Sequence, residues 1–188
     1  MADIVPTSAS ILVSTGLAAE STGGAAAQLE REVVQLFDAF RKPVLRYLLG
    51  IGLPVEDAEE IVQEVFLALF QHLRRGKARH NLRGWMFRVA HNLGLKKRKQ
   101  RGMIPGAVGQ HPVADPSPNP EDQYANAQQQ GRLLAVVNAL SEQDRACLFL
   151  RAEGLRYREI TQTLGMSLGA VSISLARSIA RIGRAAER

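Results

Sequence analysis

Apolar residues recur every three or four positions along residues 28–101, the spacing that gathers them on one face of an α-helix. Three such stripes run along residues 29–48, 61–73 and 82–93. Pro43 is expected to kink or split the first helix, Gly50 and Gly52 to end it, and Asn81 to cap the third. The pattern predicts a small helical domain over residues 28–101.

A second helical pattern fills residues 128–188. Ser141 is expected to cap a helix over residues 142–152, followed by a short helix over 157–164 and a last helix from about Ser167. Gly165 permits the left-handed backbone of a tight turn, so the last two helices are predicted to form a helix-turn-helix. Such a unit leaves one face of its second helix free to enter the major groove of DNA. An ordinary helical hairpin within a core is the alternative.

Two segments lack a periodic apolar face. Residues 1–27 are rich in Ala, Ser, Thr and Gly, and residues 102–127 hold five prolines, three acids and no basic residue. The first segment is predicted to be a flexible tail and the second an extended acidic linker. No strand pattern occurs in the sequence, so the predicted fold class is all-α. The chain is expected to form two small helical domains joined by a flexible linker, the C-terminal one a helix-turn-helix.

The net charge of +6 is divided unevenly along the chain. Residues 28–101 carry +7 (15 basic minus 8 acidic) and residues 128–188 carry +4 (9 minus 5), whereas residues 1–27 carry −2 and residues 102–127 carry −3. Two basic blocks suit a protein that touches a polyanion at two places, although ordinary solvated Lys and Arg side chains give the same balance. Arg177, Arg181 and Arg184, spaced by four and three residues, are candidate phosphate contacts.

The third predicted helix has a second face, away from its apolar stripe. Phe87, Arg88, His91 and Asn92 fall on this face when residues are counted at 100° each. An aromatic ring among these polar groups could stack on unpaired bases while the polar groups read their edges. The alternative is that Phe87 packs on a neighbouring helix and His91 is an ordinary surface residue.

The second predicted helix carries four acids near its start, Asp57, Glu59, Glu60 and Glu64. Because these carboxylates would repel DNA, a basic domain that keeps them is expected to present them to a protein surface. Solvated carboxylates that favour a helix N-terminus are the alternative.

Enzyme chemistry finds little support in the sequence. The four histidines have no partners at metal-ligand spacing, a single cysteine excludes the usual structural zinc sites, and there is no glycine-rich phosphate loop. We therefore expect no enzyme, no metal and no cofactor. No run of residues approaches the roughly 18 apolar positions of a membrane span. The lone Cys147, between apolar neighbours, fits a reducing cytoplasm.

At three motifs the sequence resembles the extracytoplasmic-function group of sigma factors, the minimal members of the bacterial sigma-70 family. The residues from Asp57 to Phe66 are similar to the helix that docks on the polymerase beta-prime coiled coil. Those from Trp85 to Asn92 are similar to the helix that melts and reads the minus-ten element. Leu140 to Arg145 followed by Gly154 to Ile160 resembles the domain that reads the minus-thirty-five element. The resemblance covers residues 28–101 and 129–184.

The resemblance implies a transcription initiation factor that binds core RNA polymerase, recognises promoter DNA and helps to melt the minus-ten region. Implied partners are the beta-prime coiled coil and beta flap of the polymerase and promoter DNA, and an anti-sigma factor is left open. The implied polymerase contacts are Asp57, Glu60, Gln63 and Glu64. The implied minus-ten contacts are Arg79, Asn81, Arg83, Phe87, Arg88, His91, Asn92 and Lys96, with the loop from Arg75 to Asn81 holding a flipped base. The implied minus-thirty-five contacts are Arg156, Arg158, Ser172, Ile173, Ser174, Arg177 and Arg181.

The recognition helix departs from the family pattern. Where the family often has Thr-Val-Lys/Arg-Ser-Arg, this chain has Ala170-Val171-Ser172-Ile173-Ser174, with no basic residue before Arg177. Serine contacts, methyl contacts or DNA shape would have to replace reading of guanines by Arg or Lys. Two other functions compete: a helix-turn-helix regulator that never joins polymerase, and a nucleic-acid enzyme such as a recombinase.

Overall fold

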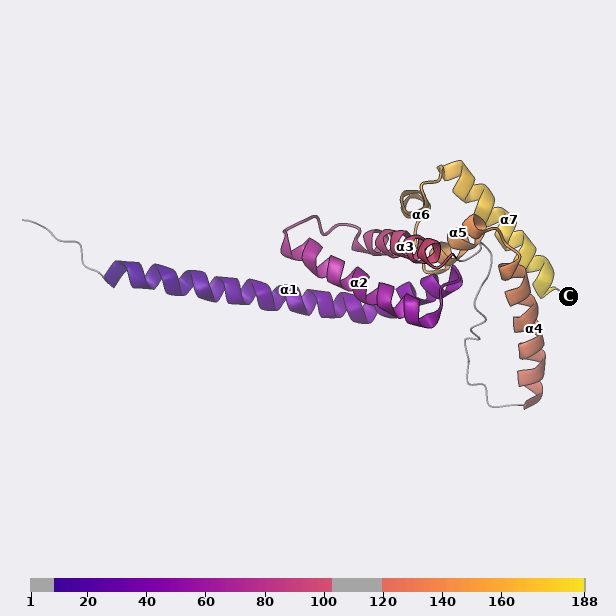
Figure 1. Cartoon of the computed structure of the whole chain (residues 1–188), viewed down its shortest axis with the longest axis horizontal. Helices are drawn as coiled ribbons and strands as arrows, with labels where there is room; N and C mark the ends of the chain where they lie inside the picture. Colours follow the sequence, from indigo (N-terminus) through magenta and orange to yellow (C-terminus); the bar gives the residue numbers. More distant parts are fainter. Residues whose placement is uncertain (1–8, 103–119, 188) are drawn as a thin grey trace, which may run out of the picture.

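The structure, a computed structural model, describes residues 9–102 and 120–187. Within these ranges the secondary structure consists of seven helices and no strand, which confirms the predicted all-α class. In chain order the helices are α1 (Ala9–Gly50), α2 (Val55–Arg74), α3 (Leu82–Gln100), α4 (Pro120–Asn138), α5 (Glu142–Ala152), α6 (Tyr157–Leu164) and α7 (Leu168–Ala186) (Figure 1).

Helix α1 differs from its prediction at two places. It continues without interruption through Pro43, although a proline removes one backbone hydrogen bond. Val44, Tyr47 and Leu48, just after Pro43, are fully buried, and this packing outweighs the local penalty. At its other end α1 begins at Ala9, so residues 9–27 are helical rather than a flexible tail. This stretch is rich in alanine, the residue with the highest helix propensity.

The predicted linker differs as well. Residues 103–119 lie outside the described residues, but the segment from Pro120 onward already belongs to α4. Proline is well tolerated in the first turn of a helix, where its missing N–H would have no partner. The helical C-terminal segment therefore starts eight residues before the expected boundary at 128.

Helices α1, α2 and α3 pack together into the first bundle. A turn closed by Gly52, whose φ is 93°, ends α1 and leads into α2 as predicted. The apolar stripe of α2 is buried against its neighbours, with Ile61, Val65 and Leu69 at most 2% exposed. This burial leaves the opposite, acidic side of α2 in water.

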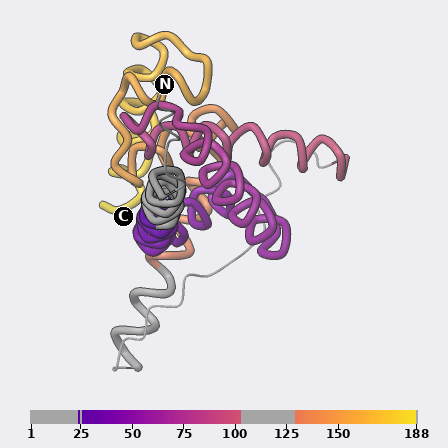
Figure 2. The backbone as a smooth tube through the Cα atoms, turned by 90° about the vertical axis from the view of Figure 1, so that its left-hand side faces the viewer, coloured from indigo at the N-terminus to yellow at the C-terminus, as the bar shows by residue number. Residues whose placement is uncertain are grey.

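The C-terminal helices form the predicted helix-turn-helix. Gly165 adopts a left-handed φ of 66° between α6 and α7, which are bent by 105° relative to each other. Ser141 caps α5, as predicted, by accepting a hydrogen bond from a backbone N–H group. Ser167, the expected start of the last helix, caps α7 in the same way. Figure 2 shows the C-terminal helices gathered on one side of the molecule.

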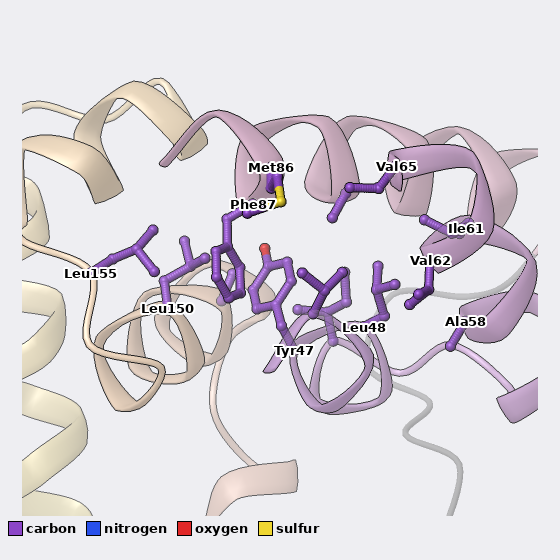
Figure 3. Close-up of a cluster of buried hydrophobic side chains, with 14 of the residues drawn as sticks. Tyr47, Leu48, Ala58, Ile61, Val62, Val65, Met86, Phe87, Leu150 and Leu155 are labelled. Atoms are coloured by element: carbon purple, nitrogen blue, oxygen red, sulfur yellow. The ribbon is translucent and has the colours of Figure 1, made fainter. Parts of the chain in front are cut away.

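The two helical units share one apolar core rather than lying apart. Tyr47 of α1 and Phe87 of α3 are fully buried next to Leu150 and Leu155 from the C-terminal unit (Figure 3). The buried Cys147 belongs to the same cluster. Polar contacts cross the boundary too: Arg98 of α3 pairs with Glu142 of α5, and Arg83 donates to the backbone carbonyl of Glu153. The structure is thus a closed arrangement of both units.

In the ranges that the structure covers, no single helix has both the length and the apolar composition needed to cross a membrane. The pair α6 and α7 passes by length and composition only when both helices are counted together across their bend.

Candidate functional site

The acidic side of α2 is the first candidate surface. Glu56, Glu59, Gln63 and Glu64 are exposed, and Glu60 is exposed while accepting from Lys97 Nζ at 2.5 Å. This side is negative because the apolar stripe of the same helix occupies the buried face.

Asp57 does not belong to this acidic surface. It is 2% exposed, and its Oδ1 lies 2.7 Å from Arg101 Nη2 and 3.7 Å from Lys97 Nζ. The carboxylate near the N-terminus of α2 therefore ties down the C-terminal end of α3. Asp57 was predicted as a polymerase contact, but in the structure its carboxylate is buried in an internal ion pair. The spacing of acidic residues along the sequence cannot reveal such a pair.

A small groove lies beside the acidic surface, between α1 and α2. Its volume is about 270 Å³, and its lining comprises Phe37, Arg41, Leu45, Glu59, Val62 and Gln63. The Arg41 guanidinium lies 5.6 Å from the centre of the Phe37 ring. The sequence patterns placed Phe37 in a core stripe, so they gave no sign that its ring reaches this groove.

On α3, two of the predicted minus-ten residues are engaged inside the protein. Phe87 is fully buried and packs edge-on against Tyr47, with ring centres 5.7 Å apart, so it cannot stack on a base in this arrangement. His91 is partly buried, and its Nδ1 lies 2.7 Å from the Tyr47 hydroxyl. Burial lowers the pKa of His91, which favours the neutral imidazole. The packing alternative holds for Phe87, because Tyr47 is its partner.

Three other predicted residues of α3 form an exposed polar row. Arg88, Asn92 and Lys96 are exposed and spaced by four residues, so they line up along one side of the helix. Lys99 is exposed one turn further on. This row, defined here as the α3 basic row, has the charge to meet a phosphate backbone and one amide able to read a base edge.

The loop before α3 is fastened at several points. Asn81 has a left-handed φ of 55°, and its Oδ1 accepts from the Gly84 backbone N–H at 3.1 Å, which confirms the predicted N-cap. Arg79 pairs with Glu32 of α1 at 2.9 Å. His72 Nε2 lies 2.9 Å from the Ala78 carbonyl oxygen. The loop is thus held in a defined shape beside the start of α3.

Arg83, a further predicted minus-ten residue, is partly buried. Its guanidinium lies 6.0 Å from the Phe40 ring centre and donates to the Glu153 carbonyl. It joins the two helical units and is not available to DNA in the closed arrangement.

Some of the predicted DNA contacts on the helix-turn-helix are exposed, whereas others are engaged inside the protein. Arg156, Arg158, Ser172, Ile173 and Arg181 are all exposed. Ser174 is 2% exposed, and its hydroxyl donates to Asp144 Oδ1 at 2.7 Å. Ser174 is therefore a packing residue of the helix-turn-helix, and its prediction as a DNA contact does not fit its place.

Arg177 shares the carboxylate that Ser174 binds. Its Nη2 donates to Asp144 Oδ1 at 2.7 Å and to Oδ2 at 2.9 Å, although half of the arginine side chain is exposed. Burial alone would raise the pKa of Asp144, but the hydrogen bonds from Arg177 and Ser174 outweigh it and lower the pKa below its usual value. The same bond raises the pKa of Arg177. Asp144 thus fixes α7 against α5.

A cleft is shared by one predicted minus-ten residue, Asn81, and two predicted minus-thirty-five residues, Arg156 and Arg158. Its volume is about 670 Å³, and it is lined by Asn81 from the loop before α3 and by a set from the N-cap of α6, α6 itself and the start of α7: Arg156, Tyr157, Arg158, Glu159, Gln162 and Leu168. Predicted minus-ten and minus-thirty-five residues therefore face the same cleft. Over the described residues, no cluster of His, Cys, Asp or Glu has a geometry that could hold a metal ion.

Comparison with protein families gives two matches. The model for sigma-70 region 2 matches residues 36–102, and the model for sigma-70 region 4 matches residues 130–182. The first match covers the last third of α1 together with α2 and α3, and the second covers the second half of α4, α5 and the helix-turn-helix.

Curated relatives of this chain are described as RNA polymerase sigma factors. The ECF RNA polymerase sigma factor SigE of Mycolicibacterium smegmatis is 35% identical over 121 residues, which are 61% of this chain and 46% of the relative. The probable RNA polymerase sigma factor RfaY of Xanthomonas campestris is 28% identical over 164 residues, 84% of this chain and 41% of the relative. The chain thus spans less than half the length of these two. The ECF sigma factor RpoE of Cereibacter sphaeroides, 28% identical, is matched over 81% of this chain and 85% of its own length.

Two solved structures share the fold. CnrH in complex with the cytosolic domain of CnrY has a TM-score of 0.59 at 21% identity and covers 85% of this chain and 92% of its own. The sigma factor RpoE in complex with the anti-sigma factor NepR, from Bartonella quintana, has a TM-score of 0.62 at 18% identity and covers 84% and 98%.

Proposed function

This chain belongs to the extracytoplasmic-function group of the sigma-70 family, and from that membership we propose that it binds core RNA polymerase and directs initiation at specific promoters. The observation that carries the proposal is the presence of both sigma regions in one chain. A regulator that acts through its helix-turn-helix alone would not need the sigma-70 region 2 that residues 36–102 match. The proposed action consists of binding and strand separation, without a covalent step, in the cytoplasm.

The proposed polymerase contact is the exposed acidic side of α2, through Glu60, Gln63 and Glu64. Support comes from its charge, because a row of carboxylates on a basic domain repels DNA and suits a basic protein surface. Glu59 and Gln63 also line the groove against α1, so a partner could bury apolar area beside the charged contacts. The proposed partner surface is the beta-prime coiled coil, with the beta flap contacting the C-terminal unit.

The proposed minus-ten contact is the α3 basic row, Arg88, Asn92 and Lys96, together with the loop from Arg75 to Asn81. The row is exposed, and the loop is held by hydrogen bonds at His72 and at the Asn81 cap. A preformed loop loses little entropy when it accepts a nucleotide. Phe87, His91 and Arg83 would contribute indirectly, because their internal contacts hold α3 in place.

The proposed minus-thirty-five contact lies on the helix-turn-helix, with Arg156, Arg158 and Arg181 as phosphate contacts and the start of α7 in the major groove. Arg177 would position α7 through Asp144, since both oxygens of that carboxylate accept from it.

The closed arrangement must open before both promoter elements are bound. Elements centred near −10 and −35 are about 25 base pairs apart, which is about 85 Å of duplex at 3.4 Å per base pair. In the closed arrangement Asn81, proposed for the minus-ten element, instead lines one cleft with Arg156 and Arg158, proposed for the minus-thirty-five element. We therefore include separation of the two helical units in the proposed mechanism, driven by binding to polymerase.

An anti-sigma factor is a further proposed partner. The two similar solved structures are described as complexes with the cytosolic domain of CnrY and with the anti-sigma factor NepR. A protein that holds the two units closed would keep this chain from polymerase.

The test of the proposed function is binding to core RNA polymerase, measured by fluorescence anisotropy with the labelled full-length chain. We expect saturable binding that weakens at least tenfold in Glu64→Lys. The control Glu30→Lys, on the exposed side of α1, should bind as the unchanged protein does. Absence of binding to an active core enzyme would contradict the proposal.

A further inference from the structure

An apolar side chain projects from the start of the recognition helix α7. Ile173 is 65% exposed, the largest exposed fraction among the large hydrophobic side chains of the described residues. Gly169 and Ala176, about one helical turn before and after it, are also exposed and are short. Ile173 therefore protrudes from this side of α7, at the end of the helix whose residues contact base edges in a helix-turn-helix complex.

The polar neighbours of Ile173 on the inner side of α7, the Ser174 hydroxyl and the Arg177 cation, are both bound to Asp144. Ser174 donates to one oxygen of this carboxylate, and Arg177 donates to both. Bidentate reading of guanine needs a free Arg or Lys at the base edge. The first two turns of α7 offer none, because the first arginine of the helix is Arg177.

The side chains that remain at this position can distinguish one base by its shape. Among the four bases, only thymine carries a methyl group in the major groove, and apolar side chains contact it there. The Ser172 hydroxyl can donate or accept, so it fits several bases without selecting one strongly.

From this arrangement we propose that Ile173 reads a thymine methyl group, so that the minus-thirty-five element of this sigma factor has a thymine at one fixed position beneath α7. Affinity then comes from phosphate contacts by Arg156, Arg158 and Arg181, and selectivity comes from the apolar contact. The inference rests on the proposed function, since it specifies what the helix-turn-helix reads.

The test removes the methyl group and nothing else. Holoenzyme assembled from the full chain first selects minus-thirty-five elements from a randomised duplex library, and each thymine of the selected element is then replaced by uracil. At one position this replacement should weaken promoter binding roughly fourfold, the factor expected for one buried methyl-sized group. Ile173→Ala should bind thymine and uracil templates equally.

The matched control is Ile179→Ala. Ile179 is 58% exposed on the same helix but lies about 120° around the axis from Ile173, so this variant should keep the full uracil effect. Three results would overturn the inference. The unchanged protein could bind both templates equally, the selected element could have guanine or cytosine at every position, or Ile173→Ala could keep the full uracil effect. In these outcomes the holoenzyme still initiates. If no holoenzyme forms at all, the proposed function fails and this inference with it.

Discussion

Arg46 and Glu153, 107 residues apart, form a two-point contact between the helical units: Arg46 Nε and Nη2 donate to Oε1 and Oε2 of Glu153 at 2.8 and 2.7 Å. The carboxylate is 9% exposed, while half of the arginine side chain remains in water. This bond raises the pKa of Arg46, and the backbone carbonyl of Glu153 also accepts from Arg83. Glu153 therefore makes several of the polar contacts that hold the two helical units in the closed arrangement.

Replacing Glu153 with Gln should loosen the closed arrangement. Because the pair is partly exposed, the expected loss is about 1 kcal/mol or less, and high salt should weaken the unchanged pair too. Small-angle scattering should show a larger radius of gyration for Glu153→Gln at low salt. The control Glu30→Gln, on the exposed side of α1, should scatter as the unchanged protein does. Equal radii for all three would show that this pair does not hold the units together.

Arg145 places a charged side chain inside the core. It is fully buried, and its guanidinium nitrogens have no hydrogen-bond partner among the residues that the structure describes. Burial lowers its pKa, and the nearby charge of Arg98 lowers it further. An unpaired buried cation is unfavourable, and exchange for an apolar residue of similar length is often stabilising.

Arg145→Met should therefore raise the free energy of unfolding, by about 1–3 kcal/mol. The measurement is the midpoint of urea denaturation followed by circular dichroism. Arg98→Met is the contrast, because it removes the partner of Glu142 and should lower the midpoint. A lower midpoint for Arg145→Met would mean that the guanidinium has a stabilising partner.

His91 should make stability depend on pH. Its folded-state pKa lies below the usual value of about 6.5, because it is buried beside Tyr47 and near Arg98, with Glu142 acting in the opposite direction. The unfolded chain then binds more protons than the folded protein. Stability is consequently full above about pH 6.5 and is lost as pH falls below that value through the folded pKa.

The expected contribution is at most about 1.4 kcal/mol per pH unit. Thermal melting between about pH 7.5 and 5.5 should show a shallower fall for His91→Gln than for the unchanged chain, whereas exposed His80→Gln should fall as the unchanged chain does. Identical slopes for His91→Gln and the unchanged protein would rule out this role.

Asp57 and Glu64 lie on the same helix but should respond differently to substitution. Asp57→Ala removes a buried acceptor from Arg101 and Lys97 and should lower stability by about 1–3 kcal/mol. Glu64→Ala should leave the melting temperature unchanged because Glu64 is exposed, and it should weaken polymerase binding. Paired melting and binding curves check both. An unchanged melting temperature for Asp57→Ala would contradict its structural role.

Local signals predicted most of the fold. The helix from Tyr157 to Leu164, the caps at Asn81 and Ser141 and the start of the last helix near Ser167 follow from apolar spacing and from side chains that act within four residues. The helical state of residues 9–27 does not follow from the hydrophobic pattern, because this stretch lacks a clear apolar face and its main helix-favouring feature is its alanine content.

The site was less predictable because burial of individual residues depends on distant partners. Asp57 is bound by Arg101, 44 residues away, and Ser174 by Asp144, 30 residues away. Phe87 lies against Tyr47, and neither ring position nor helix register can be read from periodicity alone. Residues on the exposed side of the same helices, such as Glu64 and Arg88, were predicted to be exposed because the apolar stripe marks the opposite face.

The central claim is that this chain directs RNA polymerase to promoters. The most direct measurement is transcription in vitro with purified core RNA polymerase, the full-length chain and a genomic fragment library, with the 5′ ends of the products sequenced. We predict transcripts that start at defined positions downstream of shared paired motifs and that disappear when the chain is left out. Transcription that stays at the level of core enzyme alone, while the same core responds to another sigma factor, would contradict the account.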